Sequence, residues 1–472
     1  MQCRGRMYPH MNTIHTNVLV LGSGTAGSNA ARAAVTAGAE KVTLIQPRTL
    51  INTCVEEGCM PSKSILAGAH YKETLPEVLT IRDAHIDRLK KALTDSLEEE
   101  EFEIVRGLAS FVNNTTVQVT DAEIKTVYTA DSIVIATGSH PFVPPIPGLD
   151  SLGDRMMISD DVVAKKAHFK TVPKKILTIG GGPIGLELST FFHDMGSDVQ
   201  VLQRDKALGL FDPEFGDERV RASMDAGSFP IHLRANLMKT ALTDDGVLCT
   251  IEKDGDVTEE LFDAVLVATG RASNLSSLAP ENTDIKYTDQ GTIIYDNTMQ
   301  TTVANIYIAG DVTGHYQILH FAAEMGKVAG HNAASNEEPI SINYDKLMLA
   351  VSFDQFPSAL IGLIEKEAVS RGIKVITATK QFNSIGLGIL KRQEYGLWKV
   401  VAEADTGKII GSQILGPDSA GELIQILVPI LANGNTYDDV LAMTWYHPTY
   451  GEIIKSIARD LAQKRHSLKA GM

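Results

Sequence analysis

Short apolar runs and helical patterns alternate along the first half of the chain, and one order of elements occurs twice. In the first copy, apolar strand patterns at 17–21 and 42–45 flank an alanine-rich helical pattern at 28–37. The second copy has strand patterns at 175–179 and 199–202 and a helical pattern at 186–195. Because each copy places a glycine-rich turn between its first strand and its helix, the pattern predicts an α/β protein with two Rossmann-like units.

Later segments indicate where these units end and where the pattern of apolar and polar positions changes. Strand patterns that carry Ala-Thr-Gly follow the two units at 133–138 and 265–271, and a further strand at 306–311 ends in Ala-Gly-Asp. The proline-rich stretch 141–147 is predicted to be a hinge between the units. From Tyr344 onward, longer alternating segments and two apolar helices predict a separate α+β domain.

Six glycines carry the two turns, and each set has GxGxxG spacing. They are Gly22, Gly24 and Gly27 in the first turn and Gly180, Gly182 and Gly185 in the second. In such a turn the first glycine permits the tight bend, the second lets the main chain approach a pyrophosphate, and the third permits close packing of helix on strand. One such motif is weak evidence, but both copies lie between a strand and a helix, so we predict two dinucleotide sites.

The residue at the end of the second strand of each unit normally accepts hydrogen bonds from the adenosine ribose and is usually acidic. Here that residue is Gln46 in the first unit and Gln203 in the second, and Arg204 follows Gln203. A neutral amide does not repel a 2′-phosphate, and Arg204 could bind one. The second nucleotide could therefore be NADP as well as NAD, and an exposed arginine without this role remains an alternative.

Composition narrows the function classes. The net charge of -15 argues against binding nucleic acid, and no apolar run reaches the length of a membrane span. The segment 89–103 is predicted to be a charged, solvated helix. Four cysteines in 472 residues are too few for a disulfide-stapled secreted scaffold, and the N-terminus lacks an apolar signal region. We expect a cytoplasmic enzyme that binds neither membrane nor nucleic acid.

Two of the four cysteines stand close together. Cys54 and Cys59 are separated by four residues, so one distorted helical turn could bring their sulfurs within bonding distance. A zinc site would need further ligands, which the isolated Cys3 and Cys249 do not supply, and no metal is expected. A redox-active disulfide is the favoured interpretation, with Lys63 supplying a cation that stabilises a thiolate. Cys249 is predicted to be a buried strand residue, and Cys3 lies in an N-terminal extension of unassigned role.

A histidine near the C-terminus could act as an acid–base group. Glu452 follows His447 by five residues, and its carboxylate could turn back onto the imidazole and set its tautomer. A structural histidine remains an equal alternative from spacing alone. His315 and His320 have no carboxylate or thiol cluster beside them, so packing near a cofactor is the better interpretation.

Together these motifs resemble the class I pyridine nucleotide-disulfide oxidoreductases, the family of dihydrolipoamide dehydrogenase, glutathione reductase and mercuric reductase. The resemblance extends from about Asn17 to Lys464. It implies two Rossmann-like domains that bind FAD and NAD(P), and a C-terminal α+β dimerisation domain. The predicted domains are an FAD-binding domain with the redox disulfide at 1–150, an NAD(P)-binding domain at 151–275, a returning FAD segment at 276–343 and the dimerisation domain at 344–472.

The resemblance also implies individual roles. Cys59 matches the thiol beside the flavin, and Cys54 matches the interchange thiol that forms a mixed disulfide with substrate. Glu187 matches the partner of Lys63. His447 matches the acid–base histidine and Glu452 its partner; in this family the histidine reaches the site from the other subunit, so a homodimer with shared active sites is implied. The cofactor contacts expected besides the six glycines are Gln46, Thr53, Ala136, Thr137, Gly138, Gln203, Arg204, Gly270, Arg271, Gly310 and Asp311.

Among family members, dihydrolipoamide dehydrogenase is the most similar in its second glycine turn and in length. Mercuric reductase is disfavoured because no cysteine follows Cys249. Gln46 and Gln203 depart from the dehydrogenase pattern, which has acidic residues at these positions. We therefore expect a dithiol or disulfide substrate, and keep two alternatives: an NADPH-dependent reductase of small disulfides, similar to glutathione reductase, and a redox-sensing flavoprotein with little turnover. The segment 423–432 is the candidate for the buried face of the dimer.

Overall fold

The computed structural model describes residues 13–47, 51–165, 169 and 171–470, which form two compact units. The first unit consists of 1–60, 86–140 and 271–343, and the second of 61–85, 141–270 and 344–472. Cys3 lies outside the described residues. Each unit therefore contains segments that are distant in the sequence, and each is described by itself below.

The first unit is built on a seven-stranded sheet. Its central strand β1 (Thr13–Leu21) pairs in parallel with β2 (Val42–Gln46) and with β6 (Ile124–Ile135). The last strand to join is β17 (Ile306–Ile308), which pairs in parallel with β6. The strands that surround the first predicted turn are thus confirmed, and the segment at 306–308 returns to the same sheet.

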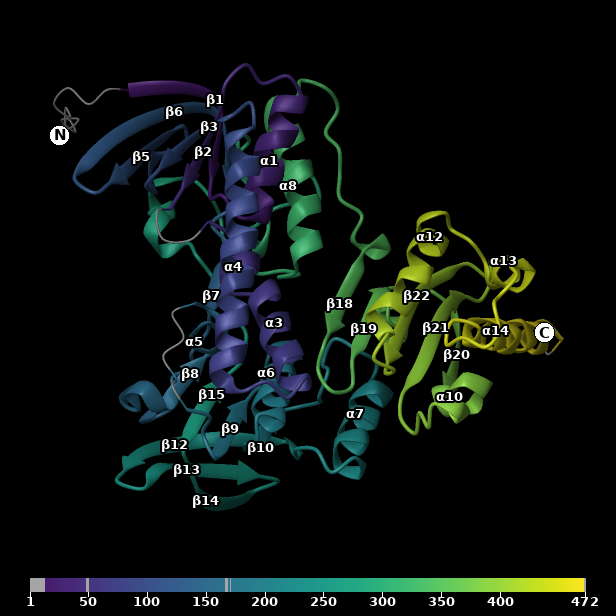
Figure 1. Cartoon of the computed structure of the whole chain (residues 1–472). Coiled ribbons are helices and arrows are strands. Elements are labelled where there is room, and N and C mark those ends of the chain that lie inside the picture. The colour runs from purple at the N-terminus through teal and green to yellow at the C-terminus, as the bar shows by residue number, and fades with distance from the viewer. Residues whose placement is uncertain (1–12, 48–50, 166–168, 170, 471–472) are drawn as a thin grey trace. The chain divides into compact units, whose positions relative to one another are not determined.

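Two helices of the first unit lie side by side, α1 (Thr25–Thr36) and α8 (Leu319–Ala334) (Figure 1). Their backbones approach so closely that a Cβ on Gly326 would lie 2.2 Å from the carbonyl oxygen of Ala26, and one on Gly330 would lie 2.0 Å from that of Ala30. Small residues at this crossing therefore allow the glycine turn and the returning segment to share one packed layer.

The predicted helix at 89–103 needs correction. Helix α4 extends over Leu75–Glu98, and strand β3 begins at Glu103. β3 (Glu103–Arg106) pairs in parallel with β2, and the neighbouring Phe102 is buried. Pairing with a buried strand therefore overrides the helical preference of the acidic run. The prediction of one solvated helix rested on the charge of this run alone. The sheet is completed by β4 (Leu108–Asn113) and β5 (Thr116–Asp121).

The second unit contains the second Rossmann-like sheet, with strand order β11-β10-β9-β15-β8, and all of its pairs are parallel. Helix α6 (Pro183–Asp194) follows the second glycine turn. The five strands are β8 (Met156–Ile158), β9 (Lys175–Ile179), β10 (Asp198–Gln203), β11 (Ile231–Leu233) and β15 (Ala264–Val267). An antiparallel sheet of β12 (Ala235–Thr243), β13 (Gly246–Lys253) and β14 (Asp256–Phe262) extends the unit.

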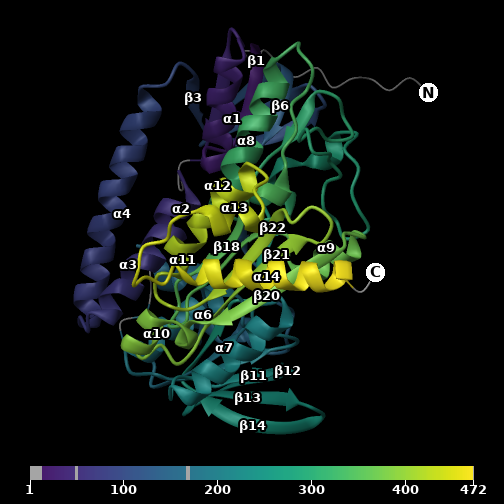
Figure 2. The ribbon, with the colours of Figure 1, turned by 90° about the vertical axis from the view of Figure 1, so that its right-hand side faces the viewer.

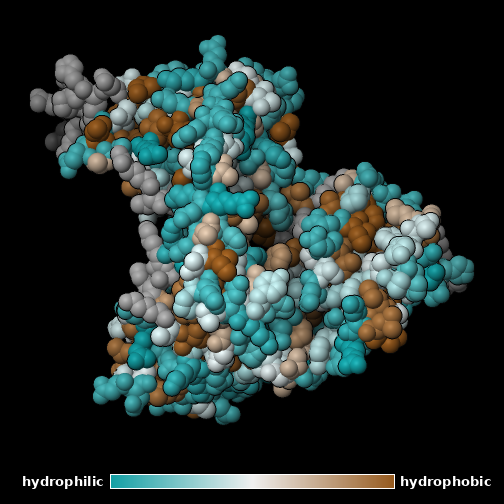
Figure 3. All heavy atoms as spheres, viewed as in Figure 1, coloured by the Kyte–Doolittle hydropathy of each residue, from teal (hydrophilic) through white to brown (hydrophobic). Residues whose placement is uncertain are grey.

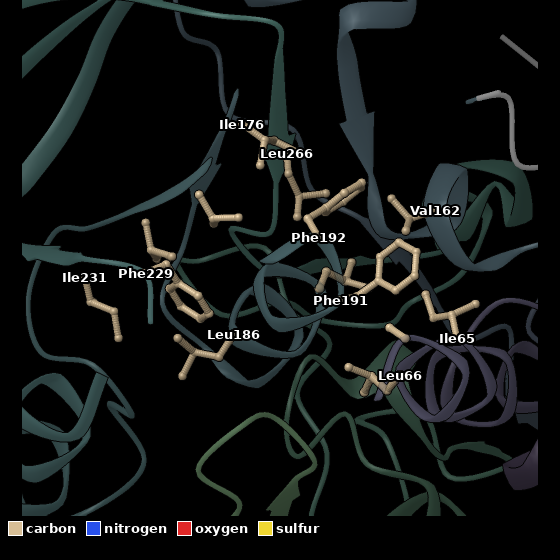
Figure 4. Close-up of a cluster of buried hydrophobic side chains, with 14 of the residues drawn as sticks. Ile65, Leu66, Val162, Ile176, Leu186, Phe191, Phe192, Phe229, Ile231 and Leu266 are labelled. Carbon is tan, nitrogen blue, oxygen red and sulfur yellow. The ribbon is translucent and has the colours of Figure 1, made fainter. Parts of the chain in front are cut away.

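A large apolar cluster anchors α6 in the second unit (Figure 4). Phe191 and Phe192 are fully buried, and their ring centroids lie 5.1 Å apart in an edge-to-face arrangement. Ile65 and Leu66, from helix α3 (Cys59–His70), belong to the same cluster. Burial of two aromatic rings fixes the helix that begins at the glycine turn, and it therefore also fixes the residues of its first turns.

The C-terminal part of the second unit is an antiparallel sheet with the order β18-β19-β22-β21-β20. Its strands are β18 (Met348–Ser352), β19 (Ser358–Gly362), β20 (Val375–Gln381), β21 (Leu397–Glu403) and β22 (Ile409–Leu415). Helix α14 (Ile453–Ala470) lies along β20 and β21 (Figure 2), and it buries Ile453, Ile457 and Leu461 from one helical face. This confirms the predicted amphipathic helix.

The apolar segment 423–432 is divided among α11 (Ala420–Leu423), a short 3-10 turn at Ile424–Ile426 and α12 (Leu427–Ala432). Its residues Ile424, Leu427, Ile430 and Leu431 are buried in the core of the chain itself. These four side chains are therefore not available to a second subunit, and the interface role remains a prediction for the rest of the segment. Among the helices in the described part of the chain, none is long and apolar enough to cross a membrane.

Candidate active site

The first glycine turn lies between β1 and α1 and leaves room for a ligand at one position. Gly22 has a φ of 118°, and a Cβ there would lie 2.3 Å from the carbonyl oxygen of Ala136. A Cβ on Gly27 would lie 1.8 Å from the carbonyl oxygen of Gly22, whereas one on Gly24 would meet nothing within 4 Å. Two glycines are thus required by the fold itself, and Gly24 keeps open backbone at the helix N-terminus, which fits the pyrophosphate of FAD.

The second turn repeats this arrangement. Gly180 has a φ of 109° and lies against the carbonyl oxygen of Ala268, Gly185 lies against Gly180, and a Cβ on Gly182 would meet nothing within 4 Å. Ala136 and Ala268 each begin an Ala-Thr-Gly segment. Their carbonyl oxygens therefore pack against the first glycine of the two turns in the same way. The residues present fit a second dinucleotide at the start of α6.

The two strand-end glutamines have different environments. Gln46 is buried at the end of β2. The Gln203 side-chain oxygen accepts a hydrogen bond from the Gly181 N–H at 2.8 Å, and its amide donates to the Lys206 carbonyl at 3.2 Å. Gln203 therefore braces its own glycine turn. Arg204, Asp205 and Lys206 are all exposed just beyond the strand, so a second cation accompanies Arg204, with a carboxylate between the two.

A polar network in the first unit joins residues from three segments. Asp311 Oδ2 accepts a hydrogen bond from Ser139 at 2.8 Å, and Arg271 Nε donates to the same hydroxyl at 2.7 Å. The Thr137 hydroxyl donates to the Asn274 carbonyl at 2.6 Å. Ser139 and Asn274 were not identified from the sequence, although each lies within three residues of an identified one. Arg271 is thus tied to the first unit, beside the returning segment, although the sequence placed it with the second turn.

The redox segment is held by its own hydrogen bonds. Asn52 caps the single turn α2 (Thr53–Glu56) by accepting from the Val55 N–H. Glu56 Oε1 accepts from the N–H groups of Ile51 and Asn52 at 2.7 and 3.2 Å, and Lys90 pairs with the same carboxylate. Cys54 is half-buried in this turn. Cys59 is exposed at the first position of α3, so the two thiols belong to successive short helical segments, and their pairing as a redox disulfide stays a prediction.

Lys63 lies one turn beyond Cys59 on α3 and forms an ion pair in the second unit. Its Nζ lies 2.7 Å from Glu187 Oε2, and Glu187 is buried in the first turns of α6. Burial raises the pKa of Glu187, and the neighbouring Lys63 ammonium opposes that rise. The predicted pairing of Lys63 with Glu187 is therefore present. Phe353 touches both side chains and was missed because nothing near it in the sequence carries a motif.

His447 and Glu452 also form the predicted pair. His447 Nδ1 lies 2.8 and 3.1 Å from the two carboxylate oxygens, the imidazole is 72% exposed, and the carboxylate is 20% exposed. The carboxylate thus holds one ring nitrogen and leaves the other for chemistry. A Cβ on Gly386 of α10 (Gly386–Leu390) would lie 3.8 Å from His447 Cε1. Ile389 and Leu390 of this helix are exposed, and Figure 3 shows hydrophobic surface at the place where Figure 1 labels α10.

Two other predictions concern residues away from these pairs. Cys249 is fully buried in β13, and burial raises the pKa of its thiol to about 12, as expected for a structural cysteine. The rings of His315 and His320 pack edge-on or tilted against the neighbouring Tyr316 and Phe321. These contacts are with sequence neighbours, and packing near the cofactor stays a prediction for both histidines.

Comparison with known proteins decides the family. A family model described as pyridine nucleotide-disulphide oxidoreductase matches residues 16–326. The chain belongs to this family. A second model, described as the dimerisation domain of the same family, matches residues 348–458. The pyridine nucleotide-disulphide oxidoreductases use FAD and NAD(P), so the protein is a flavin-dependent disulfide oxidoreductase with the α/β fold predicted above.

Several relatives are similar over nearly the whole chain. The dihydrolipoyl dehydrogenase of Bacillus subtilis (strain 168) is 30% identical over 94% of this chain and 96% of its own length. That of Geobacillus stearothermophilus is 31% identical with the same coverage. A mercuric reductase of Staphylococcus aureus is 29% identical over 90% of this chain and 78% of its own length. The structure of the HOCl-induced flavoprotein disulfide reductase RclA from Escherichia coli has a TM-score of 0.82 at 23% identity, covering 94% of this chain and 99% of its own, which shows the shared fold.

Proposed function

We propose that the protein is a dihydrolipoyl dehydrogenase, which oxidises a small aliphatic dithiol and delivers the electrons to NAD(P)+. The observation that carries the proposal is the exposed His447 imidazole, held by Glu452 and bordered by the apolar surface of α10. An imidazole with one nitrogen fixed by a carboxylate can take a proton from a thiol. Ile389 and Leu390 are exposed on the same short helix as Gly386, the residue near the imidazole, and they suit the hydrocarbon part of a lipoyl group. Whole-length similarity to two dihydrolipoyl dehydrogenases supports the same substrate.

In the proposed reaction, His447 takes a proton from the substrate dithiol, and the resulting thiolate attacks Cys54. The Cys54–Cys59 disulfide breaks, a mixed disulfide forms at Cys54, and Cys59 leaves as a thiolate. The second substrate thiol then displaces Cys54, so the substrate leaves as a disulfide and both cysteines are reduced. Bound FAD supplies the route by which this electron pair reaches NAD(P)+. Lys63 and Glu187 hold a positive charge close to the thiolate, and a disulfide reductase uses the same residues in reverse.

We also propose that the protein acts as a homodimer in the cytoplasm. The dimerisation model covers 348–458, which includes His447 and ends six residues after Glu452. Because the imidazole is largely exposed within its own chain, it can serve a site on a second copy. A low cysteine content and an exposed reactive thiol are typical of a reducing compartment.

The substrate proposal is tested by assaying the FAD-loaded protein with dihydrolipoamide and either NAD+ or NADP+. We expect nucleotide reduction with at least one of them. If the protein retains FAD, is reduced by NADH or NADPH, and yet oxidises no dihydrolipoamide, the substrate assignment is wrong. Glutathione disulfide and NADPH form the second arm, and turnover there alone would identify a small-disulfide reductase.

The second arm has structural support at the end of β10. Arg204 and Lys206 are exposed there on either side of Asp205, and the strand-end residue Gln203 is neutral and turned to its own glycine loop. An NADP 2′-phosphate would bind these cations through charge-assisted hydrogen bonds. An NADPH-dependent disulfide reductase is therefore the second candidate function.

We expect Arg204→Glu to raise the KM for NADPH by about ten- to hundredfold, since a charge-assisted hydrogen bond is worth roughly 1.5–3 kcal/mol. The KM for NADH should change much less. Steady-state kinetics with both nucleotides measure this, with the exposed Arg234→Ala as a matched control in the same unit. Equal changes in the two KM values would exclude recognition of a 2′-phosphate by Arg204.

A further inference from the structure

The turn of residues 353–357, between β18 and β19, contacts both members of the Lys63–Glu187 pair. The Phe353 N–H donates to Glu187 Oε1 at 3.0 Å and leaves Oε2 to accept from Lys63. The ring centroid of the same residue lies 4.8 Å from Lys63 Nζ, within the range of a cation–π interaction. One residue therefore orients the carboxylate with its amide and the ammonium with its ring.

The 353–357 turn is fastened at its ends and to α6. The Ser358 N–H donates to Ser352 Oγ at 3.1 Å, which closes the base of the turn. The Gln355 N–H donates to Thr190 Oγ1 at 3.3 Å, and Thr190 lies three residues after Glu187 on the same helix. The turn is thus attached to α6 at two points, so a shift of the turn would move the group that holds Glu187.

A buried ion pair anchors the middle of this turn. Asp354 Oδ2 lies 3.7 Å from Nε of Arg219, and both side chains are 0% exposed. Arg219 belongs to α7 (Pro213–Asp225), and its guanidinium lies 4.9 Å from the ring centroid of Phe356 and 5.6 Å from that of Phe229. Asp354 Oδ1 also accepts from the Phe356 N–H at 2.8 Å. Charge and aromatic packing therefore fix Asp354 next to Phe353.

Burying this ion pair carries a large desolvation free energy. Among the described residues, the Arg219 nitrogens and Asp354 Oδ2 lack a hydrogen bond of good geometry. A loosely bonded buried pair contributes little to stability in comparison with apolar side chains of the same volume. What the pair does provide is charge balance, because the Asp354 carboxylate adds to the burial that raises the pKa of Glu187. Arg219 neutralises this second buried carboxylate.

We propose that Arg219 and Asp354 are positioning residues, whose buried pair holds the 353–357 turn so that Phe353 keeps the Lys63 ammonium and the Glu187 carboxylate in register. The Lys63 ammonium then keeps one fixed position, where its positive charge favours reduction of the bound flavin. This inference rests on the proposed role of Lys63 beside FAD. It goes beyond that role because it assigns the control of the pair to α7 and to a turn that carries no motif.

The test is the midpoint potential of bound FAD in Arg219→Met. Loss of the guanidinium releases the turn and with it the Lys63 ammonium, so the potential should fall, because a displaced positive charge favours flavin reduction less. We expect kcat to fall by about ten- to hundredfold, the usual cost of a displaced reactive group, with the KM for dithiol within a factor of two. Adding Asp354→Asn removes the unpaired carboxyl group but does not restore the anchor, so the potential should stay low, and full recovery would overturn the positioning role.

Controls separate positioning from stability. Arg221→Met removes a half-exposed arginine two residues away on α7, and it should leave the potential unchanged. Lys63→Met should itself lower the potential; if it does not, the proposed role of Lys63 fails, which is a different result from failure of the Arg219 inference. If Lys63→Met shifts the potential and a folded, FAD-loaded Arg219→Met does not, the inference is wrong. Should Arg219→Met not fold, Arg219→Lys decides in the same way, since it keeps a buried cation but loses the planar group that packs against Phe229 and Phe356.

Discussion

Cys54→Ser is expected to remove dithiol and disulfide turnover almost completely, by roughly four orders of magnitude or more, while FAD remains bound. A serine hydroxyl at the interchange position cannot form the mixed disulfide, and loss of a nucleophile generally costs this much. Reduction of an artificial dye by NADH or NADPH does not need the cysteine pair, so it should persist. The measurement is the ratio of dihydrolipoamide oxidation to dye reduction at a fixed amount of bound FAD.

Two matched variants make this result specific. Cys59→Ser should also abolish dithiol turnover, because the pair must close and open as a disulfide. Cys249→Ala removes a thiol that is fully buried in β13 and should leave the ratio unchanged. Exposure alone does not identify the interchange thiol, because Cys54, which is proposed for that role, is half-buried whereas Cys59 is exposed. Dithiol turnover by Cys54→Ser within tenfold of the wild-type rate would exclude the proposed interchange role.

Lys399→Met should destabilise the second unit by roughly 3 kcal/mol or more, the usual cost of removing one partner from a buried ion pair. Lys399 is buried in β21, where its ammonium lies 2.9 Å from Asp212, 2.5 Å from Glu214 and 2.6 Å from Glu365. Burial would lower the pKa of Lys399, but the hydrogen bonds that its ammonium donates to these carboxylates raise it above its usual range. The three carboxylates could by spacing hold a metal ion, and in this structure the ammonium lies among them as their cation.

The expected loss of stability is concentrated in one pair, because Asp212 is 2% exposed whereas Glu214 and Glu365 are about two-fifths exposed and screened by solvent. Urea unfolding of Lys399→Met measures it, with Lys91→Met as the control, since Lys91 forms an exposed i,i+4 pair that is worth about 0.5 kcal/mol or less. Adding Asp212→Asn to Lys399→Met should recover part of the loss. A change below about 1 kcal/mol in the single variant would contradict the buried-pair account.

The same pair sets a pH dependence. Burial would raise the pKa of Asp212, but hydrogen bonds from Lys399 and Gln413 outweigh it and lower the pKa below its ordinary 3.8. A depressed carboxyl pKa contributes stability that is present above the unfolded value and lost as pH falls through the folded value. Wild-type stability should therefore fall below about pH 3.8 in part through Asp212. This component should be much smaller in Lys399→Met.

Periodicity and spacing predicted the parts of the fold that depend on local chemistry. The strands flanking each glycine turn lie where the apolar runs indicated, because a parallel strand buried on both faces is apolar along most of its length. The boundaries of α4 were mispredicted, since a charged run is compatible with a solvated helix or an edge strand until a partner strand is known. The boundary of the unit that holds Arg271 could not be read either, because it depends on which sheet the returning chain joins.

The sequence by itself indicated the chemistry: two thiols five positions apart, a histidine with a glutamate five residues later, and two glycine-rich turns. These features involve neighbours within one turn or one loop, so local geometry suffices to identify them. Only the tertiary structure decided which groups support that chemistry from afar. Phe353, Arg219 and Lys399 carry no motif, and their contacts join segments more than a hundred residues apart in the chain. Long-range pairs of this kind arise from packing and charge burial, for which sequence spacing contains no signal.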